Sequence, residues 1–226
     1  MICLVTAGPT YEPLDSVRRL TNFSTGELGI RLSNALVEAG HTVVLLLGQM
    51  STCSLVPRAS VIARFGTTEE LSTLLQQQAA TTQFDAVFHA AAVSDFRPSR
   101  VLQGPGPAEG TPVRAKKIPS GIQSLWVELI PTPKLICRFR EWFPDAWIVG
   151  WKYAAEGSRE EAFAAAWRQI LTCRTDACVL NGPSYGQGFA LLQPGREVET
   201  FSDRVGLAYG LARECSERAR SQKLAP

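Results

Sequence analysis

The stretch ICLVTAGPTYEPLDSVRRLTNFSTGELG, residues 2–29, decides the fold of this chain. It starts with apolar residues typical of a buried strand, breaks at residues 7–10, and continues through a polar loop to a helix expected to begin near residues 24–27. A strand, a loop and a helix N-terminus in this order favour an anion site, because the loop has unpaired N–H groups and the helix end carries positive partial charge. We expect Ser24 to be the N-cap, with Glu27 completing a capping box.

The loop after this first strand is unusually long. Loops that lead from strand to helix usually have about 2–6 residues, and this one is several times longer. A long ordered loop at the carboxyl end of a strand is a common place for a ligand. The alternative is an ordinary surface excursion.

Composition excludes several classes of protein. The 226 residues have a hydrophobic fraction of 45% and a net charge of +2, which indicates a globular chain with no nucleic-acid surface. We find no apolar run long enough for a membrane span and no signal-peptide pattern, so we expect a cytoplasmic protein without a membrane partner.

Cysteine and histidine usage limits metal and redox chemistry. With two histidines, a histidine-rich metal site is excluded. The cysteines are scattered and form no C-x-x-C pair, so we expect reduced thiols. They are Cys3, Cys53, Cys137, Cys173, Cys178 and Cys215.

The rest of the chain alternates between strand and helix patterns, which predicts a Rossmann-like parallel sheet with helices on both faces. We expect strands at 2–5, 42–47, 61–65, 84–92, 125–129, 147–151 and 176–180, and helices at 29–39, 67–80, 133–142, 158–173 and 202–221. Residues 188–192 and 198–201 flank Pro194-Gly195 and predict a C-terminal β-hairpin.

Residues 97–121 interrupt this alternation. They are rich in proline and glycine and show no clear period, and we expect 104–112 to be mobile. We interpret the segment as a flap inserted into one α/β domain that covers residues 1–226, rather than as a linker between two domains.

A Rossmann-like sheet raises the question of a dinucleotide cofactor. The G-x-G-x-x-G fingerprint is missing after the first strand, and the second strand ends without an acidic residue for a ribose. No Tyr is followed four residues later by Lys, and there is no P-loop motif. Two alternatives stay open: a reductase that binds NADP through Arg18 or Arg19, and a non-catalytic nucleotide-binding or partner protein.

A set of motifs resembles the phosphopantothenate–cysteine ligase family, in family order over nearly the whole chain. The first two are T-A-G-P-T-x-E-P-L-D-x-V-R at 6–18 and T-N-F-S-T-G-E-L-G at 21–29. The later ones are A-A-V-S-D-F at 91–96, K-I-P-S at 117–120, P-T-P at 131–133, V-G-W-K at 149–152, N-G-P at 181–183 and G-F at 188–189. Nothing matches the flavin domain of the bifunctional DNA/pantothenate metabolism flavoproteins, so the chain resembles a stand-alone form of their C-terminal domain.

The resemblance implies a ligase that joins 4′-phosphopantothenate to L-cysteine, a step of coenzyme A biosynthesis. A nucleoside triphosphate, with CTP favoured over ATP, would form an acyl-nucleotide intermediate with the help of Mg²⁺. No flavin is expected. The family works as a homodimer in which flap segments cover the neighbour's site, so the expected partners are small-molecule substrates and a second copy.

The resemblance assigns catalytic roles to Asn22, Arg18 and Lys117. An amide such as Asn22 can donate to an oxyanion without adding charge; the alternative is an Asx turn. Arg18, which could exchange roles with Arg19, suits phosphate or carboxylate, or makes a surface ion pair. Lys117, or the adjacent Lys116, would hold the triphosphate, or belong to a solvated flap.

The resemblance also implies a nucleotide site at the sheet edge. Asp95 would contact the ribose or the metal, unless it is a helix cap. The alternative for Gly8 is a plain turn, and for Ala91 and Ala92 it is tight packing between helix and sheet. For Trp151 and Phe189 the alternative is a buried aromatic residue of the core. The expected nucleotide-binding residues are Gly8, Ala91, Ala92, Asp95, Lys117, Pro131, Thr132, Pro133, Trp151, Lys152 and Phe189.

The sequence departs from the family pattern at one place. Fused bacterial members carry two lysines on the helix before the sixth strand, where this chain has Gln169 and Cys173, with Arg168 and Arg174 nearby. We therefore expect a rearranged triphosphate grip or an altered choice of nucleotide.

Overall fold

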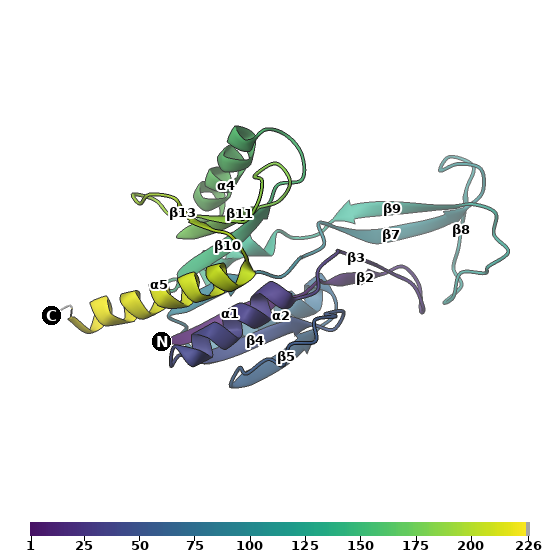
Figure 1. Ribbon diagram of the computed structural model, residues 1–226. Helices are drawn as coiled ribbons and strands as arrows, with labels where there is room; N and C mark the ends of the chain where they lie inside the picture. The colour runs from purple at the N-terminus through teal and green to yellow at the C-terminus, as the bar shows by residue number, and fades with distance from the viewer. Residues whose placement is uncertain (225–226) are drawn as a thin grey trace.

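The protein has an α/β fold built on one mixed eight-stranded sheet, in a computed structural model that describes residues 1–224 (Figure 1). The strand order is β13-β12-β11-β10-β6-β1-β4-β5. The strands from β11 to β5 are parallel, and β12 and β13 add an antiparallel hairpin. This confirms the predicted Rossmann-like core. The bounds are β1 (Ile2–Ala7), β4 (Thr42–Gly48), β5 (Val61–Phe65), β6 (Ala86–His89), β10 (Trp147–Tyr153), β11 (Ala177–Asn181), β12 (Phe189–Leu192) and β13 (Glu199–Phe201).

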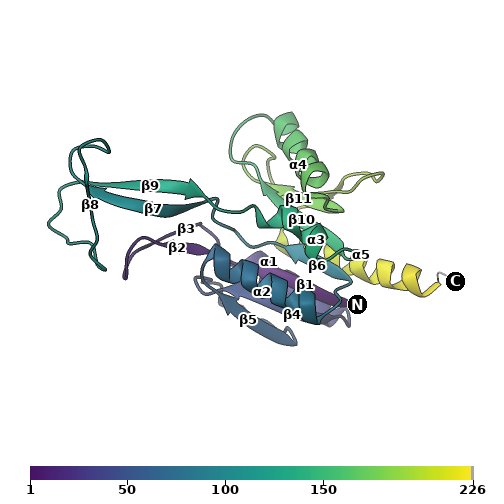
Figure 2. The ribbon, with the colours of Figure 1, turned by 180° about the vertical axis from the view of Figure 1, so that it is seen from behind.

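Helices cover both faces of the sheet, as predicted. Helices α1 (Glu27–Glu38) and α5 (Arg204–Leu224) lie on the face seen in Figure 1. The opposite face, in front in Figure 2, carries α2 (Thr68–Thr81), the 3₁₀ turn η1 (Leu135–Arg138), α3 (Phe139–Trp142) and α4 (Arg159–Cys173). Successive strand residues point to opposite faces, so Cys3 and Val5 of β1 pack toward α1 and α5 while Leu4 packs toward α2 and α3.

The helix starts are only partly as predicted. Helix α4 begins at a Ser158–Glu161 capping box. The expected Ser24 cap of α1 is wrong: the N-cap is Gly26, with φ +78° and no side-chain cap bond. Gly26 takes this left-handed conformation where Ser51 packs against it, and a glycine is favoured at such a backbone position.

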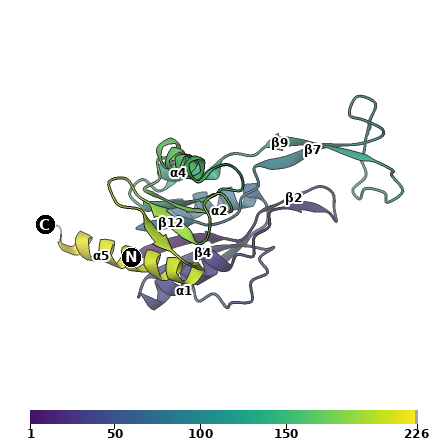
Figure 3. The same cartoon turned by 45° about the horizontal axis from the view of Figure 1, so that its top comes forward.

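Two predicted loops are in fact antiparallel ribbons. The long loop after β1 contains β2 (Tyr11–Pro13) and β3 (Arg19–Thr21), and the expected flap is an arm of β7 (Phe96–Gln103), β8 (Thr111–Pro112) and β9 (Leu125–Pro131). The arm extends far from the main sheet (Figure 3). The predicted strand at 125–129 is confirmed as β9. Most residues of β7 are exposed or half-buried, so hydrophobic alternation, the usual sign of a strand, is weak there.

The expectation of six reduced thiols is also wrong. Cys137 of η1 and Cys173 at the end of α4 form a disulfide, whereas Cys3, Cys53, Cys178 and Cys215 are free. The bonded residues are 36 positions apart in sequence, and they meet because β10 lies between η1 and α4 in the crossover. Spacing alone could not reveal this pairing.

The helices within residues 1–224 include none that is long and apolar enough to cross a membrane.

The disulfide is expected to stabilise the fold. A bridge that closes a loop of this size restricts the unfolded chain and contributes about 3–4 kcal/mol to the free energy of unfolding. We expect Cys173→Ala to lower that free energy by about this amount in chemical denaturation under non-reducing conditions. Cys53→Ser is the matched control at a free cysteine. Six reactive thiols in the denatured, non-reduced protein would contradict the pairing.

Candidate functional site

The candidate site lies at the carboxyl ends of β1 and β6. These strands are parallel neighbours, but the chain continues from β1 to β4 on one side and from β6 to β10 on the other. Ligands of open α/β sheets bind at such a switch point. Beyond the strands the backbones remain paired, because the N–H of Ala92 donates to the Gly8 carbonyl (3.0 Å) and that of Thr10 to the Ala92 carbonyl (3.1 Å).

We refer to the sheet edge at Gly8, Asn22, Ala92 and Asp95 as the crevice, after the usual binding position in open α/β sheets. One side of it is formed by glycines packed around a serine. Gly8 has φ +79°, and a Cβ there would lie 2.1 Å from Ser51 Oγ; a Cβ on Gly26 would lie 2.6 Å from the same atom. The Ser51 hydroxyl is buried and has no hydrogen-bond partner in the described chain. Because α1 begins directly after Gly26, its N-terminal N–H groups and positive partial charge face this edge, which suits an anion.

Asn22 lies at the rim of the crevice. Its Nδ2 donates to the Ala92 carbonyl at 3.0 Å, and the preceding Thr21 donates from Oγ1 to the Thr10 carbonyl at 2.8 Å. The residue is exposed, and an amide nitrogen has two N–H groups. One remains available to a ligand after the bond to Ala92.

The structure brings Asp95 and the 131–133 turn together. Thr132 donates from its backbone N–H to the Asp95 carbonyl (2.9 Å) and from Oγ1 to the Ser94 carbonyl (2.5 Å). The exposed Asp95 carboxylate pairs with Lys134 at 3.1 Å. Lys134 was not predicted as a site residue, although it directly follows the P-T-P motif.

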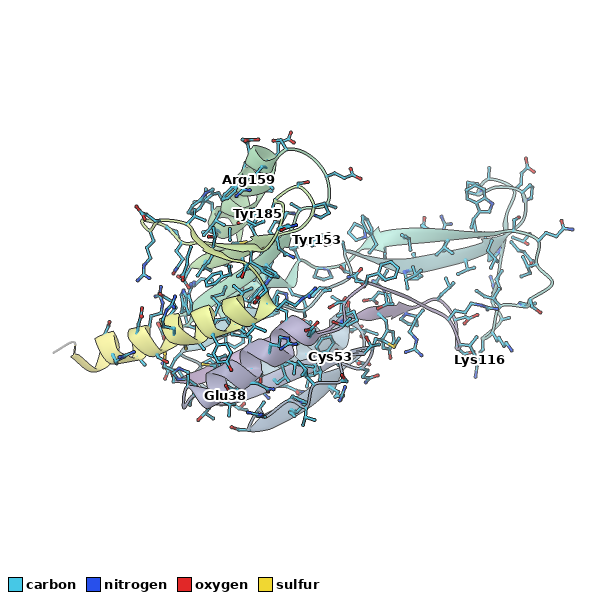
Figure 4. The ribbon with its side chains drawn as sticks, viewed as in Figure 1. Glu38, Cys53, Lys116, Tyr153, Arg159 and Tyr185 are labelled. Carbon is cyan, nitrogen blue, oxygen red and sulfur yellow. A yellow bond between two sulfur atoms is a disulfide. The ribbon has the colours of Figure 1, made fainter. Side chains whose placement is uncertain are left out.

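Arg18 and Lys117 lie elsewhere, where the β2–β3 turn meets the arm. Arg18 Nη1 contacts Asp15 Oδ2 at 2.5 Å and the Ile118 carbonyl at 3.2 Å, and Ser16 N–H donates to the Lys116 carbonyl at 2.8 Å. Figure 4 places Lys116 at the outer end of the hairpin, away from Cys53 and Tyr153. Within one chain, therefore, the structure does not bring Lys117 to Gly8 and Asn22 as the sequence analysis expected.

Asp15 is the anchor of this junction. Its side chain is only 2% exposed, and this burial opposes ionisation. Hydrogen bonds from the backbone N–H groups of Ile118, Val17 and Arg18, together with the Arg18 guanidinium, outweigh burial and hold the pKa of Asp15 well below its usual range. The carboxylate is therefore ionised at neutral pH and ties the turn to the arm.

The two aromatic candidates are less exposed to solvent than a nucleotide contact would require. Phe189 is 8% exposed and belongs to the core between the sheet and α1 and α5, which matches the alternative of a buried aromatic. Trp151 is half-buried against the same core, with no partner for its indole N–H among residues 1–224. Lys152 is half-buried. Burial raises the pKa of the nearby Cys178 thiol to about 12, and the positive charge of Lys152 partly offsets this rise.

Gln169 and Cys173, the residues at which we expected a departure from the family pattern, lie on α4. Gln169 Nε2 lies 3.6 Å from Cys178 Sγ and would be 2.6 Å from a Cβ on Gly150. Cys173 is in the disulfide. The amide and the disulfide add no charge to this edge of the sheet.

His89, at the end of β6, is a structural residue that the sequence analysis did not assign. Its Nδ1 lies 2.8 Å from Thr6 Oγ1, which accepts a bond from the N–H of Ala91 at 3.2 Å. Burial, with a smaller contribution from the charge of Lys134, lowers the pKa of His89 to about 3. The neutral ring therefore supports the start of the 90–95 segment.

A cavity of about 490 Å³ lies at the opposite edge of the sheet, among the amino ends of the strands. Five of its charged side chains pair with one another: Arg140 with Asp176, and Glu214 with Arg196 and Arg218. Across residues 1–224, no group of three His, Cys, Asp or Glu residues could hold a metal ion.

The family model and the curated relatives that match this chain agree on one family. Residues 2–202 match the model of the DNA/pantothenate metabolism flavoprotein C-terminal domain. Two curated relatives are bifunctional coenzyme A biosynthesis proteins CoaBC. The one from Thermococcus kodakarensis is 35% identical over 79% of this chain and 40% of its own length; the one from Escherichia coli K12 is 28% identical over 71% and 36%. The chain thus spans about 40% of the length of the first relative.

Solved structures support the same fold. A DNA/pantothenate metabolism flavoprotein from Streptococcus pneumoniae has a TM-score of 0.81 at 23% identity, covering 96% of this chain and 99% of that one. A Cab2 mutant in complex with phosphopantothenate-cysteine has a TM-score of 0.73 at 19% identity, covering 97% and 86%.

Gly8 and Gly40 offer a matched test of the crevice wall. Both have positive φ, but a Cβ on Gly40 would meet nothing within 4 Å. Gly40→Ala should therefore cost only the left-handed backbone, about 1–2 kcal/mol. Gly8→Ala should cost about 1–3 kcal/mol more, because the new methyl group clashes with Ser51. Chemical denaturation of both variants measures the difference, and equal losses would refute the close packing.

Proposed function

This chain belongs to the family of the DNA/pantothenate metabolism flavoprotein C-terminal domain, and on that premise we propose that it is a cytoplasmic phosphopantothenate–cysteine ligase. The observation that carries the proposal is the set of hydrogen bonds that joins Gly8, Asn22 and Ala92 at the switch point of the sheet, with Asp95 three residues further along the same segment. The Cab2 structure with phosphopantothenate-cysteine bound supports the substrate class.

The proposed reaction has two steps. The carboxylate of 4′-phosphopantothenate attacks the α-phosphorus of a nucleoside triphosphate, and pyrophosphate leaves. The amine of L-cysteine then attacks the acyl carbonyl, and the nucleoside monophosphate leaves. Asn22 would donate its free amide N–H to the oxyanion of the second step, while the backbone N–H groups near Gly8 and the α1 N-terminus would hold phosphate oxygens.

The residues of this edge fit a magnesium ion that arrives with the nucleotide. Mg²⁺ is usually held by one or two carboxylates together with substrate phosphates rather than by an all-protein cage. Asp95 is the carboxylate that the crevice offers, and Lys134 is its present partner. Bound Mg²⁺ would neutralise phosphate charge. We propose CTP or ATP as the nucleotide, with CTP favoured, and no flavin.

We also propose a homodimer in which the arm of one copy covers the crevice of the other. Arg18 and Lys117 lie at the junction of hairpin and arm rather than in their own crevice. The arm exposes large apolar side chains, including Leu125, Trp126 and Leu129, which a second copy would cover.

Pyrophosphate release tests the ligase directly. The protein, with Mg²⁺, phosphopantothenate and L-cysteine, should release pyrophosphate with CTP or ATP and form phosphopantothenoylcysteine. Omission of phosphopantothenate is the control. Folded protein that releases none with CTP, ATP, GTP or UTP would exclude the ligase. Triphosphate binding without turnover would indicate a non-catalytic nucleotide-binding protein instead.

Asn22→Asp should cripple turnover and leave the fold intact. The new carboxylate would face the Ala92 carbonyl and the developing oxyanion, and loss of one oxyanion donor alone costs about 10²–10³ in kcat. Asn34→Asp is the matched control, because Asn34 Nδ2 also donates to a backbone carbonyl, that of Val56 at 3.0 Å. Comparable kcat values for the two variants would remove Asn22 from the mechanism.

A further inference from the structure

We propose that Thr10 is a positioning residue that fixes Asn22 and Asp95 relative to each other; this rests on the function proposed above for the same crevice. Thr10 is 0% exposed, so it does not contact a ligand. Its backbone and its hydroxyl instead hold the segments that carry the two predicted site residues.

Each polar group of Thr10 forms a hydrogen bond with a residue that precedes Asn22 or Asp95 in sequence or that binds the Asn22 side chain. The Thr10 carbonyl accepts from Thr21 Oγ1 at 2.8 Å, one residue before Asn22. The Thr10 N–H donates at 3.1 Å to the Ala92 carbonyl, the acceptor that also holds the Asn22 amide at 3.0 Å. On the other side, the Ser94 N–H donates to Thr10 Oγ1 at 2.8 Å, one residue before Asp95.

The Thr10 hydroxyl makes all the hydrogen bonds that it can. A hydroxyl has one donor and two acceptor positions. Thr10 Oγ1 donates to Ser94 Oγ at 3.1 Å and accepts from the Ser94 N–H and, at 3.3 Å, from Thr68 Oγ1. Thr68 is at the start of α2, where its N–H donates to the buried Glu12 carboxylate at 3.1 Å. The segment that carries Asp95 is thus tied to both the β1 loop and α2.

Thr10→Val would separate the packing of this side chain in the core from the hydrogen bonds of its hydroxyl. Valine has nearly the same shape, so it fills the core, but it leaves the Ser94 N–H and the Thr68 hydroxyl without this partner. The backbone bonds to Thr21 and Ala92 would persist. We expect the Ser94–Asp95 end to loosen while Asn22 stays in place, which alters the geometry between the two groups.

The kinetic test compares three variants. Thr10→Val should lower kcat by about tenfold to a hundredfold, because small misplacements of reacting groups cost this much, with the KM for L-cysteine within about threefold of wild type, because Asn22 stays in place. Thr10→Ser keeps the hydroxyl and should retain kcat within about threefold. Thr175→Val is the control, because Thr175 is 5% exposed and its Oγ1 has no partner in the described chain; it should not change kcat.

Hydrogen exchange separates failure of this inference from failure of the proposed function. Mass spectrometry without any substrate should show faster amide exchange in residues 93–96 of Thr10→Val than in wild type, and unchanged exchange in Thr175→Val. A wild type without ligase activity overturns the proposed function but not this readout. Unchanged exchange or unchanged kcat in Thr10→Val overturns the positioning role, as does a Thr10→Ser variant that loses activity.

Discussion

The candidate site depends on a short backbone ladder that continues past the ends of β1 and β6. The Ala90 N–H donates to the Thr6 carbonyl, the Ala92 N–H to that of Gly8, and the Thr10 N–H to that of Ala92. In most parallel sheets the chain leaves the ladder where the strand ends. Here the two segments remain paired for several residues, so residues far apart in sequence form one wall whose backbone groups are already placed. Gly8 makes this geometry accessible, because its left-handed backbone and lack of a side chain leave room for Ser51.

A second polar cluster lies at the other end of the β2–β3 hairpin, around the buried Asp15 carboxylate. Within residues 1–224 no hydrogen bond joins this cluster directly to the crevice, but the hairpin connects the two. At one end, Thr21 bonds to Thr10; at the other, Arg18 and Asp15 bond to Ile118. The hairpin thus links the arm to the residue preceding Asn22 through a short, hydrogen-bonded ribbon.

The sequence predicted the elements whose pattern is set by burial. Continuous apolar runs such as 42–47 predicted the parallel strands, and the helical pattern at 158–173 predicted α4, whose N-cap is Ser158. It predicted one strand of the arm, at 125–129, but missed the hairpin and the arm strands β7 and β8, because strands exposed on both faces carry little hydrophobic alternation. The Cys137–Cys173 bond was missed because a crossover through β10, and not sequence spacing, brings these residues together.

The candidate site, like the fold, could be predicted from the sequence only in part. Gly8, Ala92 and Asp95 could be grouped because parallel strands share one carboxyl edge. Trp151 and Phe189 could not be placed, since an aromatic in a strand looks the same whether it faces a crevice or the core. The direction of the arm, and with it the position of Lys117, has no signature in the residue pattern. Thr10 and Ser94 stand inside quoted motifs, but only the hydrogen bonds show that they link one motif to the other.

Gln169 and Cys173, where the sequence departs from the expected family pattern, bring no positive charge to the crevice. Gln169 is neutral and packs on the sheet, and Cys173 is bonded to η1, so the C-terminal half of α4 is held against the segment that follows the 131–133 turn. Cations nearer the edge come from other elements, Lys134 after that turn and Lys152 on β10. Lys134 already lies beside Asp95. A polyphosphate bound here with its metal would compete with that ion pair, and because the pair is exposed it is worth little by itself. The exchange of partners therefore has a low energetic cost, which makes this edge more suitable for an incoming anion than a buried, fully paired cluster such as that around Asp15.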